Sequence, residues 1–324
     1  MSQPVTSLTM LPTSAPAPDS QSYFSTFEFV TAVVSVSGAA CSAHSVPVRS
    51  SGPARTMYGL ASRRSFGSRS IMLAPYGLWA SPGWSTGLED ATIVELLSHL
   101  QGLRTRDFTW NVRFDHAQLA EKLSAAGLRA TRNATRILHF TGNHEATFRN
   151  YHATIRNHIR RSIKSGLQVR SSSDSSDVKE YYEMHAVLAA SKAFRTHYPL
   201  ELFQQLVGAG GSGRLFVAEY EGRIVAGGVF FWDGRSVVYW HGGADRRYNH
   251  IFPTCGLFDT VIRWAAENGA QFFNFGASAG INSLDTFKSF WGATTEWNWS
   301  FEWRNPVWIQ LSKAASLLRN NVKE

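Results

Sequence analysis

The chain has few cysteines and no long apolar run, and both absences narrow the class of protein. Cys41 and Cys255 are the only cysteines in 324 residues. Two thiols so far apart in sequence give neither a disulfide framework nor the spacing of a metal site. No uninterrupted apolar stretch reaches the roughly 18 residues that a membrane-spanning helix requires. We therefore expect no bound metal and no transmembrane segment, with at most peripheral contact to a membrane.

Basic residues are also missing from the first part of the chain. The first one is Arg49, so the basic n-region of a secretory signal is absent and we expect a cytoplasmic protein. Residues 1–22 are rich in Ser, Thr and Pro, which predicts a disordered N-terminal tail. Several catalytic motifs are absent as well, namely GxSxG, a Walker loop, HExxH and CxxC.

What the sequence does contain is an apolar, aromatic and basic composition. Hydrophobic residues make up 44% and charged residues 17%, with 21 Phe and 11 Trp, which is typical of a globular protein. The length is sufficient for two domains. A net charge of +8 favours an anionic partner such as RNA, a phosphorylated cofactor or an acidic polymer, although such a charge also serves solubility alone.

The stretch from Leu215 to Ala293 shows the clearest pattern. Three β-rich apolar runs are separated by the short turn signals Glu221-Gly222 and Asp233-Gly234, which predicts an antiparallel meander. A helix closed by Asn268-Gly269 follows, then a strand, a short helix around Asp285–Phe290 and a last strand rich in Trp and Thr. The predicted order is β-β-β-α-β-α-β. The first four strands are expected at Leu215–Tyr220, Ile224–Trp232, Ser236–His241 and Phe272–Phe275.

Residues 149–170 form a second distinctive stretch, rich in Arg and Lys and without any acid. Phe148, His152, Ile155, Ile159 and Ile163 recur at helical spacing, which predicts one buried helix face. The other side is expected to gather like charges that an anionic partner would compensate, unless this face is simply solvated. Those charges are Arg149, Arg156, Arg160 and Lys164.

The order of these segments and their residues resemble those of the GNAT acyltransferase superfamily. Within it, they resemble the FemABX branch of peptidoglycan aminoacyltransferases and related acetyltransferases. The resemblance rests on residues 155–169, 217–231 and 272–293. It implies an α/β fold with a mixed central sheet flanked by helices, in two tandem GNAT-like domains. A degenerate copy is expected at residues 23–145, a catalytic copy at 146–305 and a C-terminal helix at 306–324.

In a GNAT fold, as the resemblance implies, two neighbouring parallel strands part and the acyl donor enters between them. Here these would be Ser236–His241 and Phe272–Phe275, parting at Gly242-Gly243, where glycine lets a ligand approach the backbone. An ordinary turn is the alternative at that position. Arg246 and Arg247 would bind the phosphates of the donor, although Gly256 lies out of register with the usual pyrophosphate loop. Arg156 and Arg160 are further expected donor-binding residues.

The pair Phe287-Lys288 resembles an FK pair that recurs ahead of a W/F-G in the FemABX-like branch. Amide formation passes through an anionic tetrahedral centre, which a lysine would stabilise; the alternative is a surface lysine. His241 is a candidate base because its pKa lies near neutrality, with Asp245 and Asp259 as weaker candidates. Arg195 and Tyr198 would bind an acceptor.

These observations predict an N-acyltransferase. Its expected donor is acyl-CoA and its expected acceptor an amine of an amino sugar, an amino acid or a cell-envelope intermediate. The alternative is aminoacyl transfer from charged tRNA to a peptidoglycan or peptide amine, which the basic helix favours. A second alternative is a GNAT scaffold without catalytic activity that binds RNA or an anionic glycan.

Overall fold

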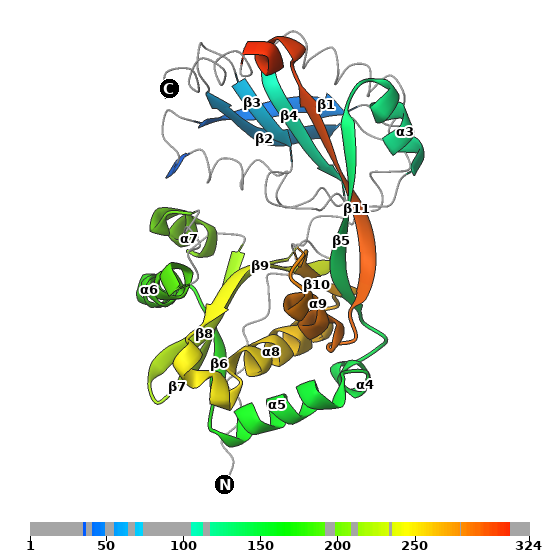
Figure 1. Cartoon of the computed structure of the whole chain (residues 1–324). Coiled ribbons are helices and arrows are strands. Elements are labelled where there is room, and N and C mark those ends of the chain that lie inside the picture. Colours follow the sequence, from blue (N-terminus) through cyan, green and yellow to red (C-terminus); the bar gives the residue numbers. More distant parts are fainter. Residues whose placement is uncertain are drawn as a thin grey trace, which may run out of the picture. The chain divides into compact units, whose positions relative to one another are not determined.

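The computed structural model describes residues 35–36, 41–48, 55–63, 69–73, 105–112, 117–191, 198–208, 213–232, 235–278 and 280–311 (Figure 1). These residues divide into two compact units. One is continuous, from Ala134 to Glu296, and the other joins the residues up to Asn133 with those from Trp297 onward. The expected domain limits at residues 145 and 305 stay a prediction, as does the idea that the first unit is a copy of the second.

The unit from Ala134 to Glu296 is built on a mixed sheet with the strand order β5-β10-β9-β8-β7-β6. All neighbours are antiparallel except β9 and β10, which run parallel. Its strands are β5 (Arg129–His139), β6 (Gln168–Ser172), β7 (Gly213–Tyr220), β8 (Arg223–Trp232), β9 (Ser236–Ala244) and β10 (Phe272–Gly276). Its helices are α4 (His144–Arg149), α5 (Ala153–Lys164), α6 (Ser175–Ser191), α7 (Leu200–Val207), η5 (Arg246–Ile251), α8 (Pro253–Glu267) and α9 (Asn282–Ser289).

The meander β7-β8-β9 confirms the pattern expected from the apolar runs. Glu221 and Gly222 both have positive φ values, of 51° and 74°, as a two-residue hairpin turn requires. β8 is buried along almost its whole length because helices cover both faces of the sheet: α6 and α7 lie on one side and α8 on the other (Figure 1). This double cover explains why β8 is continuously apolar rather than alternating.

Helix α8 contributes the aromatic side chains of Phe258 and Trp264 to the core of this unit. It ends at Asn268, followed by Gly269 with a φ of 82°, as the Asn-Gly signal predicts. Phe258 on α8 packs edge-on against Phe273 and Phe275 of β10, and Trp264 lies 5.4 Å from Phe216 of β7 between ring centroids. Because these rings are buried on both elements, α8 and the sheet form one hydrophobic core.

The other unit has the strand order β1-β2-β3-β4-β11. Trp110 of β4 and Phe301 of β11 are buried against each other. β2 was not predicted from the sequence. The elements are β1 (Cys41–Val48), β2 (Arg55–Arg63), β3 (Arg69–Leu73), β4 (Thr105–Val112), α3 (Ala117–Ala125) and β11 (Thr294–Arg304).

The prediction of one basic helix that begins at residue 149 is wrong for its first turns. Two helices occupy this stretch, α4 and α5, because His152 interrupts the helix and caps the start of α5, with its ring nitrogen accepting from the backbone N–H of Thr154. Ile163, expected on the buried face, is 63% exposed. Only Ile155 and Ile159 of the expected apolar face are fully buried in α5.

Some expected features lie outside the described residues, namely the N-terminal tail and most of the C-terminal helix. Residues 306–311, at the start of that helix, are helical. Within the described part of the chain, no helix is long and apolar enough to span a membrane. The same part contains no cluster of three His, Cys, Asp or Glu side chains with the arrangement of a metal site.

Candidate active site

Strands β9 and β10 are parallel neighbours that separate partway along their length. They pair at three positions only, from Phe272 with Ser236 to Asn274 with Val238. Beyond that point β9 stays paired with β8 up to Ala244, and β10 stays paired with β5 through Gly276 and Arg136. The sheet therefore opens between the carboxyl-terminal halves of these two strands.

The parting begins earlier than expected. The sequence placed it at Gly242, whereas the last pair joins Val238 and Asn274. The bulge in β9 lies at Trp240, because Tyr239 and His241 face consecutive residues of β8. A bulged strand bends, and this bend accounts for an opening that begins after Val238 rather than at Gly242.

Gly242 and Gly243 lie inside the regular β8–β9 ladder. A Cβ atom at Gly242 would lie 2.4 Å from the hydroxyl of Tyr239, and one at Gly243 would lie 2.9 Å from the side chain of Leu188 on α6. Close packing against neighbouring side chains is thus sufficient to require both glycines. Their expected role in donor binding stays a prediction.

The end of β10 has a backbone shape that depends on glycine and on a buried amide. Gly276 has a φ of 71°, which favours glycine. Its N–H donates to Oδ1 of Asn274 at 2.6 Å, and the hydroxyl of Thr135 also lies 3.4 Å from that oxygen. A backbone N–H can only donate, so the atom of Asn274 that binds the N–H of Gly276 must be the amide oxygen. The amide nitrogen, Nδ2, is then buried without a hydrogen-bond partner.

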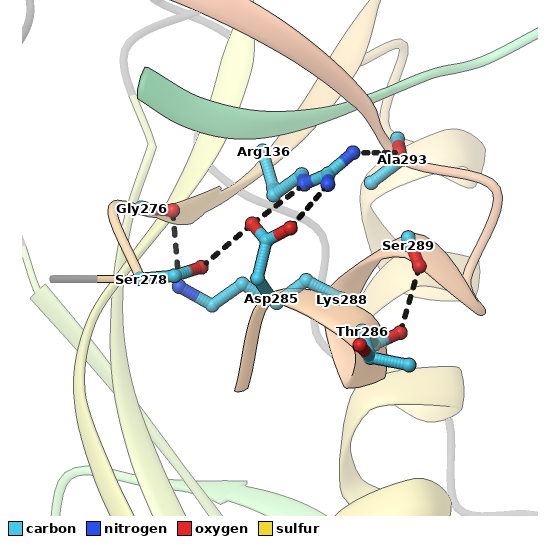
Figure 2. Close-up of polar contacts among 8 residues, drawn as sticks. All are labelled: Arg136, Gly276, Ser278, Asp285, Thr286, Lys288, Ser289 and Ala293. Carbon is cyan, nitrogen blue, oxygen red and sulfur yellow. Dashed lines mark hydrogen bonds and ion pairs between the residues drawn. The ribbon is translucent and has the colours of Figure 1, made fainter. Parts of the chain in front are cut away.

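Lys288 reaches the end of β10 from helix α9. Only 3% of the residue is exposed, and Nζ donates to the carbonyl oxygen of Gly276 at 3.0 Å (Figure 2). Nζ also donates to the carbonyl oxygen of Ala277, at 2.7 Å. An ammonium has three donors, and in the described part of the chain the third has no partner. Burial lowers the pKa of Lys288 to about 8, opposed by the carboxylate of Asp285 and reinforced by Arg136. The alternative of a surface lysine is therefore wrong.

A bidentate ion pair adjoins this lysine. Arg136 of β5 donates from Nε to Oδ1 of Asp285 at 2.9 Å, and from Nη2 to Oδ2 (Figure 2). The hydroxyl of Ser278 also donates to Oδ1 of Asp285, at 3.1 Å. The hydrogen bonds from Arg136 are the main cause that lowers the pKa of Asp285.

Phe287 fixes the orientation of α9. Its ring lies 6.2 Å from that of Phe258 and 6.1 Å from that of Trp291, between centroids. Because Phe287 packs on the core next to Lys288 in sequence, the neighbouring lysine is directed to another side of the same helix. This arrangement gives the FK pair a physical meaning: the aromatic ring anchors the helix and the lysine reaches the strand end.

His241 lies among aromatic side chains of α6 and α7. Its Nδ1 is 2.5 Å from the hydroxyl of Tyr181, and its ring is 4.0 Å from that of His185. Burial, and to a lesser extent His185, lower the pKa of His241 to about 3. It is therefore a weak base near neutral pH. Tyr198, an expected acceptor-binding residue, has its ring 6.3 Å from His241, whereas Arg195 lies outside the described residues.

The two weaker candidates for the base are both engaged in ion pairs. Asp245 caps η5 and binds Arg247, with 2.6 Å between Oδ2 and Nη2. Asp259 is buried on α8, 2.8 Å from His144 and 3.5 Å from Arg263. Neither carboxylate lies in the cluster around Lys288.

A groove of about 710 Å³ lies beside the end of β9, next to α6 and the start of η5. Arg246 and Arg247, the expected phosphate-binding residues, both line it. Arg247 is held by Asp245, whereas Arg246 makes no hydrogen bond or ion pair to any described residue. The rest of the lining is mixed, with Met184, Val187, Leu188, Ile224, Ala244 and Tyr248 beside Glu180, Glu183, Arg223 and Asp245.

The remaining expected donor-binding residues, Arg156 and Arg160, differ in their surroundings. Arg156 donates through Nη1 to the carbonyl oxygens of Tyr151 and Arg149, so its guanidinium satisfies the end of α4. Arg160 is exposed, contacts Asn157 and lies over the ring of Phe148 at 6.0 Å. Arg160 is therefore the more accessible cation of the two.

Residues that the sequence did not single out complete the cluster around Lys288. Asp285 could have been suspected, because it stands three residues before Lys288 on the same helix. Arg136 and Asn274 carried no such signal. Arg136 is distant in sequence, and its relation to Asp285 depends on the pairing of β5 with β10.

Comparison with known proteins supports this geometry. Residues 149–289 match the family model of the acetyltransferase (GNAT) domain. A stretch of 138 residues is 26% identical to the UDP-N-acetylmuramoylpentapeptide-lysine N(6)-alanyltransferase of Weissella viridescens, covering 42% of this chain and 40% of that protein. The aligned part thus spans less than half the length of that relative.

Two solved structures share the fold. The crystal structure of FemX matches with a TM-score of 0.69 and 14% identity, over 90% of this chain and 94% of that one. A tandem GNAT protein from the clavulanic acid biosynthesis pathway matches with a TM-score of 0.52 and 10% identity, over 86% and 87%. At these identities the likeness concerns the fold alone.

Residues 149–289, which match the acetyltransferase (GNAT) domain, contain the two parallel strands between which the mixed sheet opens. In sequence the chain is similar over 138 residues to an alanyltransferase, and in fold it is similar to FemX. These likenesses agree with the resemblance to the FemABX-like branch of the GNAT superfamily, and the mixed sheet flanked by helices confirms the α/β fold class expected from the sequence.

Proposed function

We propose that this protein transfers an aminoacyl group from charged tRNA to an amine of a peptidoglycan precursor. The observation that supports this donor and acceptor most is the match to an alanyltransferase that, by its name, acts on a UDP-N-acetylmuramoylpentapeptide lysine. The likeness in fold to FemX agrees with it. This order reverses the one expected from the sequence, which placed acyl-CoA first and charged tRNA second.

The proposed reaction forms an amide and releases the tRNA with a free hydroxyl on its terminal ribose. The lone pair of the acceptor amine attacks the carbonyl carbon of the aminoacyl ester, and a C–N bond forms. The carbonyl oxygen carries the negative charge of the tetrahedral intermediate. The ester C–O bond then breaks, the terminal ribose oxygen of the tRNA takes up a proton, and the amine nitrogen loses one.

In this proposal, the ammonium of Lys288 stabilises the charge that develops on the carbonyl oxygen. Two of its N–H groups hold the carbonyls of Gly276 and Ala277, which fixes the position of Nζ at the end of β10. The third N–H remains for a ligand. A donor held in advance contributes more in the transition state than in the ground state, because the charge appears only there.

The opening between β9 and β10 is the proposed place for the reacting ester, and Arg246 the proposed contact for a phosphate of the donor. Arg246 has no ionic partner among the described residues and lines a groove at the end of β9. Arg160 is a second proposed phosphate contact, on the exposed side of α5. Both would add affinity that decreases with salt.

The test is a mass-resolved transfer assay with the whole protein and a UDP-linked muramoyl pentapeptide. Alanyl-tRNA and acetyl-CoA are offered as donors in separate reactions, with and without RNase. We expect a mass increase of the acceptor with alanyl-tRNA that RNase abolishes. Transfer from acetyl-CoA that withstands RNase, with none from alanyl-tRNA, would overturn the proposal.

Acyl-CoA is the second candidate donor. One reason is that residues 149–289 match an acetyltransferase domain. Another is the likeness in fold to a tandem GNAT protein whose structure is described as the form without AcCoA. The acetyl-CoA arm of the same assay decides this case. A scaffold without catalysis would give no transfer in either arm.

A further inference from the structure

The carboxylate of Asp285 and the ammonium of Lys288 both hold the segment that follows β10. They stand three residues apart on α9, so they lie on one side of the helix. Lys288 binds the carbonyl of Gly276, and Asp285 accepts from the hydroxyl of Ser278 (Figure 2). Lys288 also binds the carbonyl of Ala277, which lies between these two residues in sequence. Three consecutive residues are thus tied to one turn of α9.

Arg136 connects this turn to the sheet. Its Cα is paired with that of Gly276 across β5 and β10, and its guanidinium binds Asp285 through two nitrogens. Its remaining nitrogen, Nη1, donates to the carbonyl oxygen of Ala293 at 3.4 Å, beyond the end of α9. The same guanidinium therefore contacts α9 and the chain that follows α9.

We propose that Asp285 and Arg136 are positioning residues for Lys288, which place its ammonium at the end of β10 and set the balance of charge around it. This inference rests on the proposed function, because it assumes that Lys288 acts on the developing oxyanion. It goes beyond that function by assigning the groups that orient Lys288 and that shift its pKa in opposite directions. Neither residue needs to touch a substrate.

The charges make opposite contributions. Burial alone disfavours the ammonium of Lys288. The carboxylate of Asp285, on the same helix, raises the pKa of Lys288, and the guanidinium of Arg136, from β5, lowers it. Among the described residues, these two are the charged groups that act on Lys288, so removing one or the other should move its titration in opposite directions.

The experiment compares Asp285→Asn, Arg136→Met and Arg136→Lys with the unmodified protein. The chain has seven lysines, so the side-chain signal of Lys288 can be assigned in a carbon-nitrogen NMR spectrum by its loss in Lys288→Ala. Its titration is then followed directly, without any substrate. Alanyl transfer is measured over the same pH range, and thermal unfolding shows that each variant is folded.

We expect the titration of Lys288 to move to lower pH in Asp285→Asn and to higher pH in Arg136→Met. The loss of turnover at high pH should move with it. Arg136→Lys keeps the charge and should leave the titration in place. A purely structural ion pair would instead destabilise Asp285→Asn and Arg136→Met alike and leave the titration unmoved, which overturns the inference.

Ser278→Ala tests the placement of the segment separately from its charge. It removes the hydroxyl that binds Asp285 but no charged group, so we expect turnover to fall by about tenfold, mainly in kcat, with the titration of Lys288 unchanged. Full turnover in Ser278→Ala would overturn the role in placement. This variant remains informative if Asp285→Asn does not fold.

Failure of the proposed function has a different signature. If Lys288→Ala keeps full turnover, then Lys288 does not stabilise the oxyanion, whatever the NMR titrations show. If Lys288→Ala loses turnover while the two charge variants show no opposed shifts, the proposed function stands and the positioning inference fails. The two results are therefore distinguishable.

Discussion

The ammonium of Lys288 donates to the carbonyl oxygen of Gly276 at 3.0 Å. Gly276 is the last residue of β10. At this residue β10 is no longer paired with β9 and is paired with β5. The lysine thus marks the end of the strand that borders the opening in the sheet. This relationship links helix α9 to the place where a GNAT acyltransferase is expected to hold its reacting group.

Lys288→Ala should reduce turnover by about 10² or more, because a charged donor to the developing oxyanion is removed. KM for the donor should change far less. In the unmodified protein, turnover should fall as the pH rises through the pKa of about 8 at which Lys288 loses its proton. Steady-state transfer assays across the pH range measure both effects.

Lys122→Ala is the matched control for this prediction. Lys122 is exposed in the last turn of α3, so its removal changes the charge of the protein by the same amount. Turnover in Lys122→Ala should stay close to that of the unmodified protein. An equal loss in both variants would contradict a specific role for Lys288.

Arg246→Ala should raise KM for the donor more than Arg247→Ala does. Both residues line the groove beside β9, but the guanidinium of Arg247 is already bound by Asp245, with 2.6 Å between Nη2 and Oδ2. A phosphate would have to compete with that carboxylate at Arg247 but not at Arg246. Equal effects, or a larger one at Arg247, would exclude the proposed phosphate contact.

Arg160→Ala should weaken the binding of tRNA. It should also make the affinity less dependent on salt: the slope of log affinity against log salt concentration should become shallower by about one unit for each phosphate contact that is lost. Arg156→Ala should lower stability instead, since its guanidinium binds the carbonyls of Tyr151 and Arg149. Filter binding at several salt concentrations and thermal unfolding separate the two. An unchanged slope in Arg160→Ala would show that this side of α5 does not contact the nucleic acid.

His241 should make the fold less stable in acid. Its pKa is about 3 in the folded protein and about 6.5 in an unfolded chain. The unfolded state therefore binds the extra proton first, so the contribution of His241 is fully present above pH 6.5 and is lost as the pH falls toward 3. His241→Gln should flatten the loss of unfolding free energy over this range, as measured by urea denaturation.

His250→Gln provides the comparison for His241, because His250 is exposed. Its replacement removes one exposed imidazole and shows the effect of the His→Gln change itself on the unfolding free energy. A lowered pKa also means that His241 accepts a proton poorly near neutral pH. We therefore expect His241→Gln to keep turnover within about tenfold, and a loss as large as that of Lys288→Ala would restore the role of His241 as the base.

Local sequence patterns were enough to predict the meander, helix α8 and strand β10. The turn at Glu221-Gly222 and the end of α8 at Asn268-Gly269 depend on backbone conformations that a few residues determine by themselves. The pair Phe287-Lys288 is a candidate through its resemblance to the FK pair of the FemABX-like branch, and its catalytic role stays a prediction. An aromatic anchor followed directly by a lysine places the two side chains on different sides of one helix.

Tertiary structure decided where the sheet opens and what surrounds the lysine. The parting of β9 and β10 at Val238 and Asn274 depends on a bulge at Trp240, which is visible only in its pairing with β8. The ion pair of Arg136 and Asp285 joins residues 149 positions apart. No local pattern encodes such a contact, because its energy arises only when strands from distant parts of the chain have paired. The sequence by itself predicted most elements of the unit from Ala134 to Glu296 and singled out Lys288 as a candidate, and the fold determined the charges and carbonyls that hold this lysine.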